Sequence, residues 1–197
     1  MSKEFYSKWK KLCKDTILDE GIKHARLKYC GDRINSENDW HRIRNPLRML
    51  YTAFVFQILG KTPPCRIKNA VYRMFGVKIG KEVAIAYNVF LDPLFPELIT
   101  IDDGVMIGSD VEIATHEFVP RWFAMGRVRI GKNCMVAAYN IISPGVTMGA
   151  GSFTGLYSFV KADIPEKEFW AGIPAKLIKK MGTSDLVPKK DLEITRY

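Results

Sequence analysis

The sequence has 197 residues, 47% of them hydrophobic, a composition that suits one folded domain with an appended segment. Its four cysteines, Cys13, Cys30, Cys65 and Cys134, form no CxxC pair and no regular spacing, which argues against a zinc site or a disulfide framework. We therefore expect reduced thiols in a cytoplasmic protein. The N-terminus lacks the apolar core of a signal peptide, and the longest apolar stretch, 49–60, is too short to span a bilayer.

The net charge of +9 is concentrated in the N-terminal part of the chain. Residues 1–78 contain 17 Lys and Arg against 7 Asp and Glu, a balance of +10, whereas residues 79–197 contain 13 against 14. Aromatic residues do not interleave with the basic ones as they do in RNA-binding motifs, so we expect no nucleic-acid partner. An anionic lipid surface or a phosphorylated substrate is a better match for this charge.

Three helices are predicted in the N-terminal region. Apolar residues at helical spacing predict the first over 3–30, followed by a loop over 35–39. An apolar helix is predicted over 47–59, and a short basic amphipathic helix over 65–75.

Two compatible roles are open for these helices. A stack of repeats needs a cap, so the helices could close the open end of the stack and bury its last coil. Alternatively, residues 42–60 lie in a membrane interface, with the basic flank at the headgroups and Phe54, Phe56 and Leu59 in the acyl boundary.

Residues 79–165 repeat every six positions. The first position of a block is aliphatic in eleven of twelve blocks, with Thr154 as the exception, and the second is Gly, Ala or Ser in nine. This period is typical of a parallel β-helix, in which three six-residue strands form one triangular coil. Twelve blocks therefore predict four coils, with the aliphatic residues pointing inward.

Two insertions interrupt the repeat, at 97–100 and at 119–129. The second closely follows His116 and contains Arg121, Trp122 and Phe123, which suit a wall that covers a ligand. A loop that packs between subunits is an equal alternative, and one loop could serve both purposes.

Three motifs accompany the repeat: IATH at 113–116, SPGVTMG at 143–149 and AGIPAKLIKK at 171–180. With them, residues 75–180 resemble the hexapeptide-repeat acyltransferases, and most closely the sugar O-acetyltransferases of the galactoside and maltose type.

The resemblance implies a mainly β fold built on a left-handed parallel β-helix of about four coils. The handedness rests on the resemblance alone, because periodicity does not determine it. We expect a basic helical extension over 1–76, the β-helix acyltransferase domain over 77–180 and a C-terminal tail over 181–197.

Acetyl transfer from a thioester to a hydroxyl requires a base, a donor for the developing oxyanion and close positioning of the two reactants. Of the three histidines, His24, His41 and His116, only His116 lies in the repeat. It matches the catalytic base of the family, and the backbone N–H of Ala138 aligns with the oxyanion donor. Glu117 is not assigned the orienting role, because adjacent strand residues usually point to opposite faces.

The sequence departs from the family at two positions. The Trp often found at the end of the IGxNxx block is Met135, and the Asn that helps seat the acceptor sugar aligns with Ala86. Candidate acceptor contacts are then Asn88, Asp92, Arg121 and Trp122. The first two are equally compatible with turn positions.

The resemblance also implies a homotrimer, with acetyl-CoA as cosubstrate in the groove between neighbouring solenoids and His116 facing a neighbour. The pantetheine arm would bond backbone groups near Met135, Gly155 and Ser158. Its phosphates need cations, for which the candidates are Lys161, Lys176, Lys179 and Lys180. Each of these lysines is equally compatible with an ordinary solvated position.

The expected activity is therefore acetyl-CoA-dependent O-acetylation of a sugar or glycan-intermediate hydroxyl, in the cytoplasm, with a weak peripheral contact to the anionic inner face of the membrane. N-acylation of an amino sugar and a non-catalytic repeat scaffold remain alternatives. A zinc enzyme of the γ-carbonic anhydrase type shares this solenoid but needs three histidines per metal from separate coils. The repeat contains one, so no metal is expected.

Overall fold

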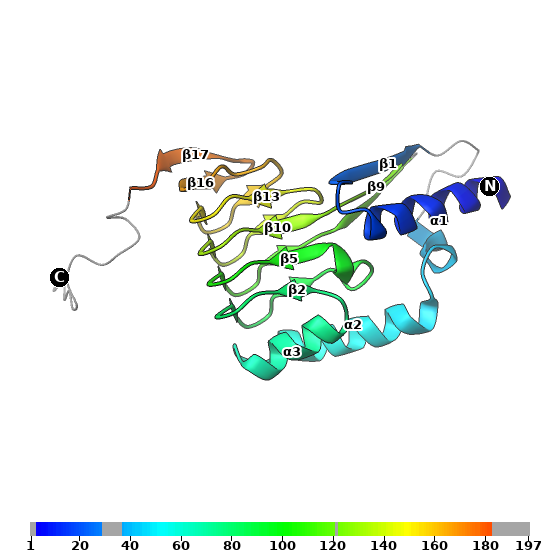
Figure 1. Ribbon diagram of the computed structural model, residues 1–197, viewed down its shortest axis with the longest axis horizontal. Coiled ribbons are helices and arrows are strands. Elements are labelled where there is room, and N and C mark those ends of the chain that lie inside the picture. Colours follow the sequence, from blue (N-terminus) through cyan, green and yellow to red (C-terminus); the bar gives the residue numbers. More distant parts are fainter. Residues whose placement is uncertain (1–2, 29–36, 121, 183–197) are drawn as a thin grey trace.

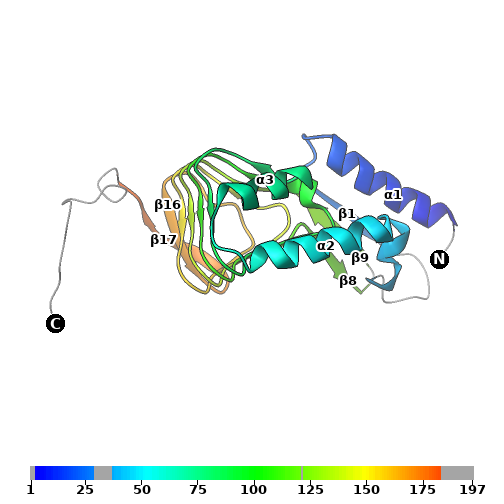
Figure 2. The same cartoon turned by 90° about the horizontal axis from the view of Figure 1, so that it is seen from below.

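The computed structural model describes residues 3–28, 37–120 and 122–182. A triangular prism of stacked coils forms the body of the molecule, with helices α2 and α3 beneath its first coil (Figures 1 and 2). Each coil contains three short strands, and four such coils follow one another, as the repeat predicts.

The strands of the four coils follow in chain order. They are β2 (Lys78–Ile79), β3 (Ala84–Ile85) and β4 (Phe90–Leu91); β5 (Ile99–Ile101), β6 (Met106–Ile107) and β7 (Glu112–Ile113); β10 (Val128–Ile130), β11 (Met135–Val136) and β12 (Ile141–Ile142); and β13 (Thr147–Met148), β14 (Phe153–Thr154) and β15 (Phe159–Val160). Strands one coil apart pair in parallel, which gives three sheets. The first sheet contains β2, β5, β10 and β13, the second begins with β3, β6, β11 and β14, and the third contains β4, β7, β12 and β15. The second sheet is extended by β16 (Glu168–Gly172) and by the antiparallel β17 (Ala175–Lys180).

The first residue of every block points into the prism, as predicted. These twelve side chains are at most 9% exposed and form the main apolar core. Thr154, the exception in the pattern, is also buried, and its Oγ1 accepts a hydrogen bond from the Ala137 N–H at 3.1 Å. The hydroxyl is therefore satisfied, which allows a polar residue in an aliphatic ladder.

The outward-facing residues differ between the three sheets. The first sheet is polar, with Lys78, Thr100, Arg129 and Thr147 in register. The second carries Ala84, Met106, Met135 and Phe153, and the third carries Phe90, Glu112, Ile141 and Phe159. At the corner between the second and third sheets, the exposed rings of Tyr139 and Tyr157 stack with their centroids 4.5 Å apart. Two of the three outer surfaces are thus largely apolar.

Helices α2 (Pro46–Gly60) and α3 (Arg66–Met74) confirm two of the predicted helices. Asn45 caps α2 by accepting hydrogen bonds from the N–H groups of Leu47 and Arg48, and Cys65 caps α3. Phe56 is 4% exposed and packs edge-on against Tyr72 of α3, with 4.8 Å between the ring centroids. The helices therefore do cap the solenoid, at its first coil rather than at its last.

The membrane-facing residues predicted for this segment need correction. Phe56 is buried and Leu59 is half-buried against the core, so neither is free to enter lipid. Phe54 is 65% exposed. The prediction assigned the whole helix to the lipid, whereas one side of it packs on the first coil and the other side is exposed.

A buried lysine fixes α3 to the first coil. Lys68 is 1% exposed, and its Nζ donates to the backbone carbonyls of Thr62, Ile85 and Ala86 at 2.9, 3.2 and 2.9 Å. Burial lowers the pKa of this ammonium. Its three donors match three acceptors, which offsets the cost of removing the charge from water.

The helix predicted over 3–30 is too long. Helix α1 (Lys3–Leu18) ends before Asp19, and His24–Lys28 is a strand, β1, while residues 29 and 30 lie outside the described ranges. Ala25 and Leu27 alternate with exposed neighbours, a period of two that the predicted helix ignored. The loop predicted over 35–39 contains a 3-10 helix, η1 (Glu37–Arg42), in its described part.

The longer insertion is a β-hairpin rather than a loop. Strands β8 (His116–Val119) and β9 (Trp122–Gly126) pair antiparallel, and β1 adds a third strand against β9. A second apolar cluster lies beneath this sheet, where Trp9 of α1 packs against Phe123 with 5.2 Å between centroids. Residues from the N-terminal region and from the repeat domain thus share one sheet and one core.

The shorter insertion forms the 3-10 helix η2 (Pro96–Leu98) and runs into β5. Its Glu97 pairs with Arg44 and Arg48, each at 2.7 Å, and so anchors the start of α2.

Within the described ranges, no helix combines the length and the apolar composition needed to cross a membrane.

Candidate active site

His116 begins strand β8, at the corner that follows the third sheet. Its Nδ1 lies 2.5 Å from Oδ2 of Asp92, which follows β4 one coil below. The imidazole is partly buried, with 22% of its side chain exposed, whereas the carboxylate is 2% exposed. This contact holds one ring nitrogen and leaves Nε2 as the nitrogen available to a substrate.

Asp92 is held by several donors. Its Oδ1 accepts from the N–H of Leu94 at 2.8 Å, and its Oδ2 accepts from the N–H and the hydroxyl of Thr115 at 3.0 and 2.6 Å. Burial by itself raises the pKa of this carboxyl, but the charge of His116 and the hydrogen bonds from His116 and Thr115 outweigh it, and the pKa is lowered. Asp92 therefore faces His116 as a carboxylate.

Asp92 was predicted as a direct acceptor contact, and its burial does not suit that role. The side chain lies behind His116, where it orients the ring. This geometry is that of the carboxylate–histidine pairs found in general-base catalysis.

A cavity of about 360 Å³ opens beside His116. Its floor comes from the first two coils, with Phe90 and Asp92 from the first and Glu112 and His116 from the second. Four further residues line its walls and were not predicted from the sequence: Glu37 and Trp40 of η1, Met49 of α2 and Phe118 of β8. Of these, only Trp40 carried a sequence signal, because it is an isolated aromatic residue in a polar segment.

Aromatic rings from the hairpin and from the segment before η2 pack against His116. The ring of His116 lies 5.0 Å from that of Phe118 and 5.8 Å from that of Phe95. Phe123, predicted to cover a ligand, is completely buried in the second apolar cluster. Trp122 lies under the guanidinium of Arg26 at 4.2 Å and does not line the cavity, and Arg121 lies outside the described residues.

Asn88 occupies a coil corner with a φ of 58°. Its Nδ2 donates to Asp110, its Oδ1 accepts from Lys61 at 2.5 Å, and its N–H donates to the carbonyl of Gly60. These bonds match the turn role that the sequence left open.

No group of three potential metal ligands occurs among residues 3–28, 37–120 and 122–182.

No family model matches the chain. It is 33% identical over 142 residues to a Bacillus subtilis (strain 168) protein named "Putative acetyltransferase YvoF", which covers 71% of this chain and 83% of that one. It is 34% identical over 145 residues to "Putative acetyltransferase SAS0727" of Staphylococcus aureus (strain MSSA476), covering 68% and 90%.

Solved structures share the fold. A galactoside acetyltransferase in complex with coenzyme A superposes with a TM-score of 0.59 at 19% identity, covering 77% of this chain and 90% of that chain. A maltose O-acetyltransferase from Clostridium difficile 630 gives 0.55 at 23% identity, covering 69% and 87%. The chain belongs to the hexapeptide-repeat acetyltransferases. Its prism is the left-handed β-helix that the family resemblance implies.

Most of the predicted cosubstrate residues of this acetyltransferase lie away from His116. Met135, Gly155 and the lysines of β17 belong to the second sheet or its edge. Lys161 differs, because it follows β15 of the third sheet, at the same corner as His116 and two coils further along. The hydroxyl of Ser158 is engaged, since it accepts from the Gly172 N–H and donates to the Gly155 carbonyl. In Figure 2, β16 and β17 lie on one side of the prism and β8 and β9 on the other. One chain therefore does not bring the predicted base together with the predicted cosubstrate residues of the second sheet and β17.

Proposed function

We propose that the enzyme transfers an acetyl group from acetyl-CoA to a hydroxyl of a sugar or glycan intermediate in the cytoplasm, with His116 as general base. The observation that carries this proposal is the contact between His116 Nδ1 and the buried Asp92 beside an open cavity. The names of the structural neighbours, a maltose O-acetyltransferase and a galactoside acetyltransferase in complex with coenzyme A, support the acceptor class and the cosubstrate.

The proposed reaction requires no covalent intermediate. Nδ1 of His116 donates its hydrogen to Asp92, so Nε2 can accept the proton of the acceptor hydroxyl while its oxygen attacks the thioester carbonyl. The backbone N–H of Ala138 would stabilise the oxyanion, and collapse of the tetrahedral intermediate releases the thiolate of coenzyme A. The imidazolium returns its proton to that thiolate.

The residues that line the cavity support a sugar as the acceptor. Trp40, Phe90 and Phe118 offer apolar surface for the C–H face of a sugar ring, and Glu112 offers carboxylate oxygens to its hydroxyls. In the assigned roles, Met135 and Gly155 would contact the pantetheine arm. Lys161, Lys176, Lys179 and Lys180 would contact the phosphates.

The activity is tested by thiol release from acetyl-CoA with a panel of neutral sugars, amino sugars and sugar phosphates. We expect release to depend on the acceptor and the acetylated product to lose its acetyl group in mild base, as an ester does. A base-stable product formed only with amino sugars would establish the N-acyltransferase instead. Absence of turnover with every acceptor would favour the non-catalytic scaffold.

We also propose a homotrimer with each active site between two subunits. The largely apolar outer surfaces of the second and third sheets, and the stacked Tyr139 and Tyr157 at their shared corner, support an association through these surfaces. A neighbour packed there would bring its Ala138 and Met135 toward His116.

Native mass measurement should therefore give three times the chain mass of 22.5 kDa. Tyr139→Asp, which adds a charge to the apolar corner, should lower the share of trimer and the activity together. A stable monomer that turns over acetyl-CoA at the wild-type rate would exclude a shared site.

A further inference from the structure

Helix α2 has a second apolar side that no described residue covers. Thr52, Phe56 and Gly60 face the first coil, and the opposite side carries five large side chains that are 51–79% exposed. These are Leu47, Leu50, Tyr51, Phe54 and Ile58. Their spacing of three and four residues places them in one stripe along the helix. A continuous exposed stripe of this kind marks a contact surface, unlike single exposed leucines.

Helix α3 extends this surface. Ile67 and Met74 are 76% and 83% exposed, and they lie on a different side of the helix from the buried Tyr72. The ring of Tyr51 in α2 lies 5.5 Å from that of Phe75, which follows α3. Together the exposed residues of the two helices form what we call the base face, at the N-terminal end of the prism (Figures 1 and 2).

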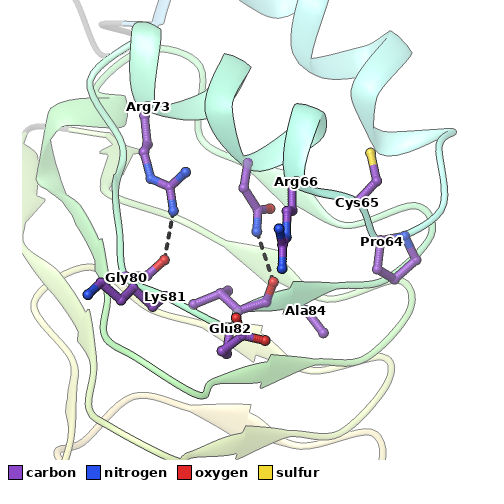
Figure 3. Close-up of a pocket in the computed structure, with 10 residues that line it drawn as sticks. Pro64, Cys65, Arg66, Arg73, Gly80, Lys81, Glu82 and Ala84 are labelled. Carbon is purple, nitrogen blue, oxygen red and sulfur yellow. Dashed lines mark hydrogen bonds between the residues drawn. The ribbon is translucent and has the colours of Figure 1, made fainter.

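A basic hollow of about 420 Å³ borders the base face, between α3 and the first turn of the first coil (Figure 3). Arg66, Arg73 and Lys81 line it, against one acidic residue, Glu82. Asn69, 7% exposed, also lines it; its Nδ2 donates to the Val83 carbonyl, and its Oδ1 has no hydrogen-bond partner among the described residues. The arginines and the lysine of the hollow thus offer cations to a phosphate.

The charge of the two helices also suits a ligand that carries phosphate. Residues 46–74 contain five basic and no acidic residues, and Lys68 is the buried one. On α3, Arg66 and Arg73 lie beside the stripe of Ile67 and Met74, so cations border apolar side chains. Basic residues along an apolar helical face are typical of helices that lie in a membrane interface.

We propose that the base face binds an anionic lipid membrane. The apolar stripes of α2 and α3 enter the boundary between headgroups and acyl chains, and the basic hollow receives a lipid phosphate. A second copy of the chain is a poorer occupant, because a face-to-face contact would bring the basic residues of one copy against those of the other. This function goes beyond acetyl transfer and does not depend on it.

Co-sedimentation of the full chain with phosphatidylcholine vesicles, with and without phosphatidylglycerol, tests the proposal. We expect binding to the acidic vesicles that weakens as salt rises. Arg66→Glu/Lys81→Glu should lower partition by about 25-fold or more, since each basic residue near such a surface contributes roughly five-fold. Phe54→Ser should lower it by about ten-fold or more.

Matched controls lie on α1, away from the base face (Figure 1). Lys10→Glu/Lys14→Glu makes the same change in net charge, and Leu18→Ser removes a side chain that is 69% exposed. Both should bind acidic vesicles like the wild type. The proposal is overturned if the wild type stays in solution with acidic vesicles, or if the α1 and base-face variants lose binding equally. It is also overturned if Phe54→Ser keeps vesicle binding and changes the native mass, because the face is then a contact between copies.

Discussion

Replacing His116 with alanine should lower the acetyl-transfer rate by about two to four orders of magnitude, the range expected for loss of a general base. Binding of coenzyme A should change little, because the proposal assigns this side chain to proton transfer alone. Steady-state thiol release with the best acceptor of the panel measures the first quantity, and calorimetric titration with coenzyme A measures the second.

His24→Ala provides the matched control. His24 is exposed on β1 and does not line the cavity, so its loss should leave turnover near the wild-type value. If His116→Ala keeps near-wild-type turnover, the base lies elsewhere and the assignment fails.

Asp92→Asn should reduce turnover on the order of 10²-fold or more while preserving the shape of the site. An amide nitrogen facing Nδ1 would donate to it and so favour the imidazole tautomer that carries its proton on Nε2, which cannot act as a base. The matched variant Asp110→Asn changes another carboxylate that accepts a side-chain hydrogen bond, here from Asn88, and should retain activity. Equal turnover of Asp92→Asn and the wild type would exclude the orienting role.

The same variant should show a pH-dependent loss of stability. The folded-state pKa of Asp92 is lowered, so its contribution to the free energy of unfolding is complete above its unfolded pKa, about 3.9, and disappears as pH falls through the lower folded value. Urea unfolding at pH 6 should therefore separate wild type from Asp92→Asn more than unfolding at pH 3. A gap that does not change with pH would mean that the pKa of Asp92 is the same in the folded and unfolded protein, and a gap that narrows from pH 3 to pH 6 would mean that folding raises it.

The repeat was predictable because its information is local. An aliphatic residue every six positions gives the coil count, and the structure places those residues in the core, including the exception Thr154. Helix-ending signals such as Gly60 and the pair Pro63 and Pro64 are likewise local, so the bounds of α2 and α3 were close to those predicted.

Features that depend on distant partners were not predictable in this way. Strand β1 forms because β9, about a hundred residues later, offers it an edge, and no helical or strand propensity encodes that pairing. Asp92 was predicted as an acceptor contact or a turn residue, because the sequence does not show that the next coil places His116 above it. Trp40 and Met49 reach the cavity only through the way η1 and α2 pack on the prism.

Helix α2 borders both the proposed active site and the proposed membrane-binding face. Met49 lines the cavity beside His116, and the next two residues, Leu50 and Tyr51, face outward on the base face. One helix, about 10 Å thick with its side chains, therefore separates this wall of the cavity from the outermost surface at this end. An acceptor whose other end stays embedded in lipid would need a tether at least as long as this helix is thick to enter the cavity.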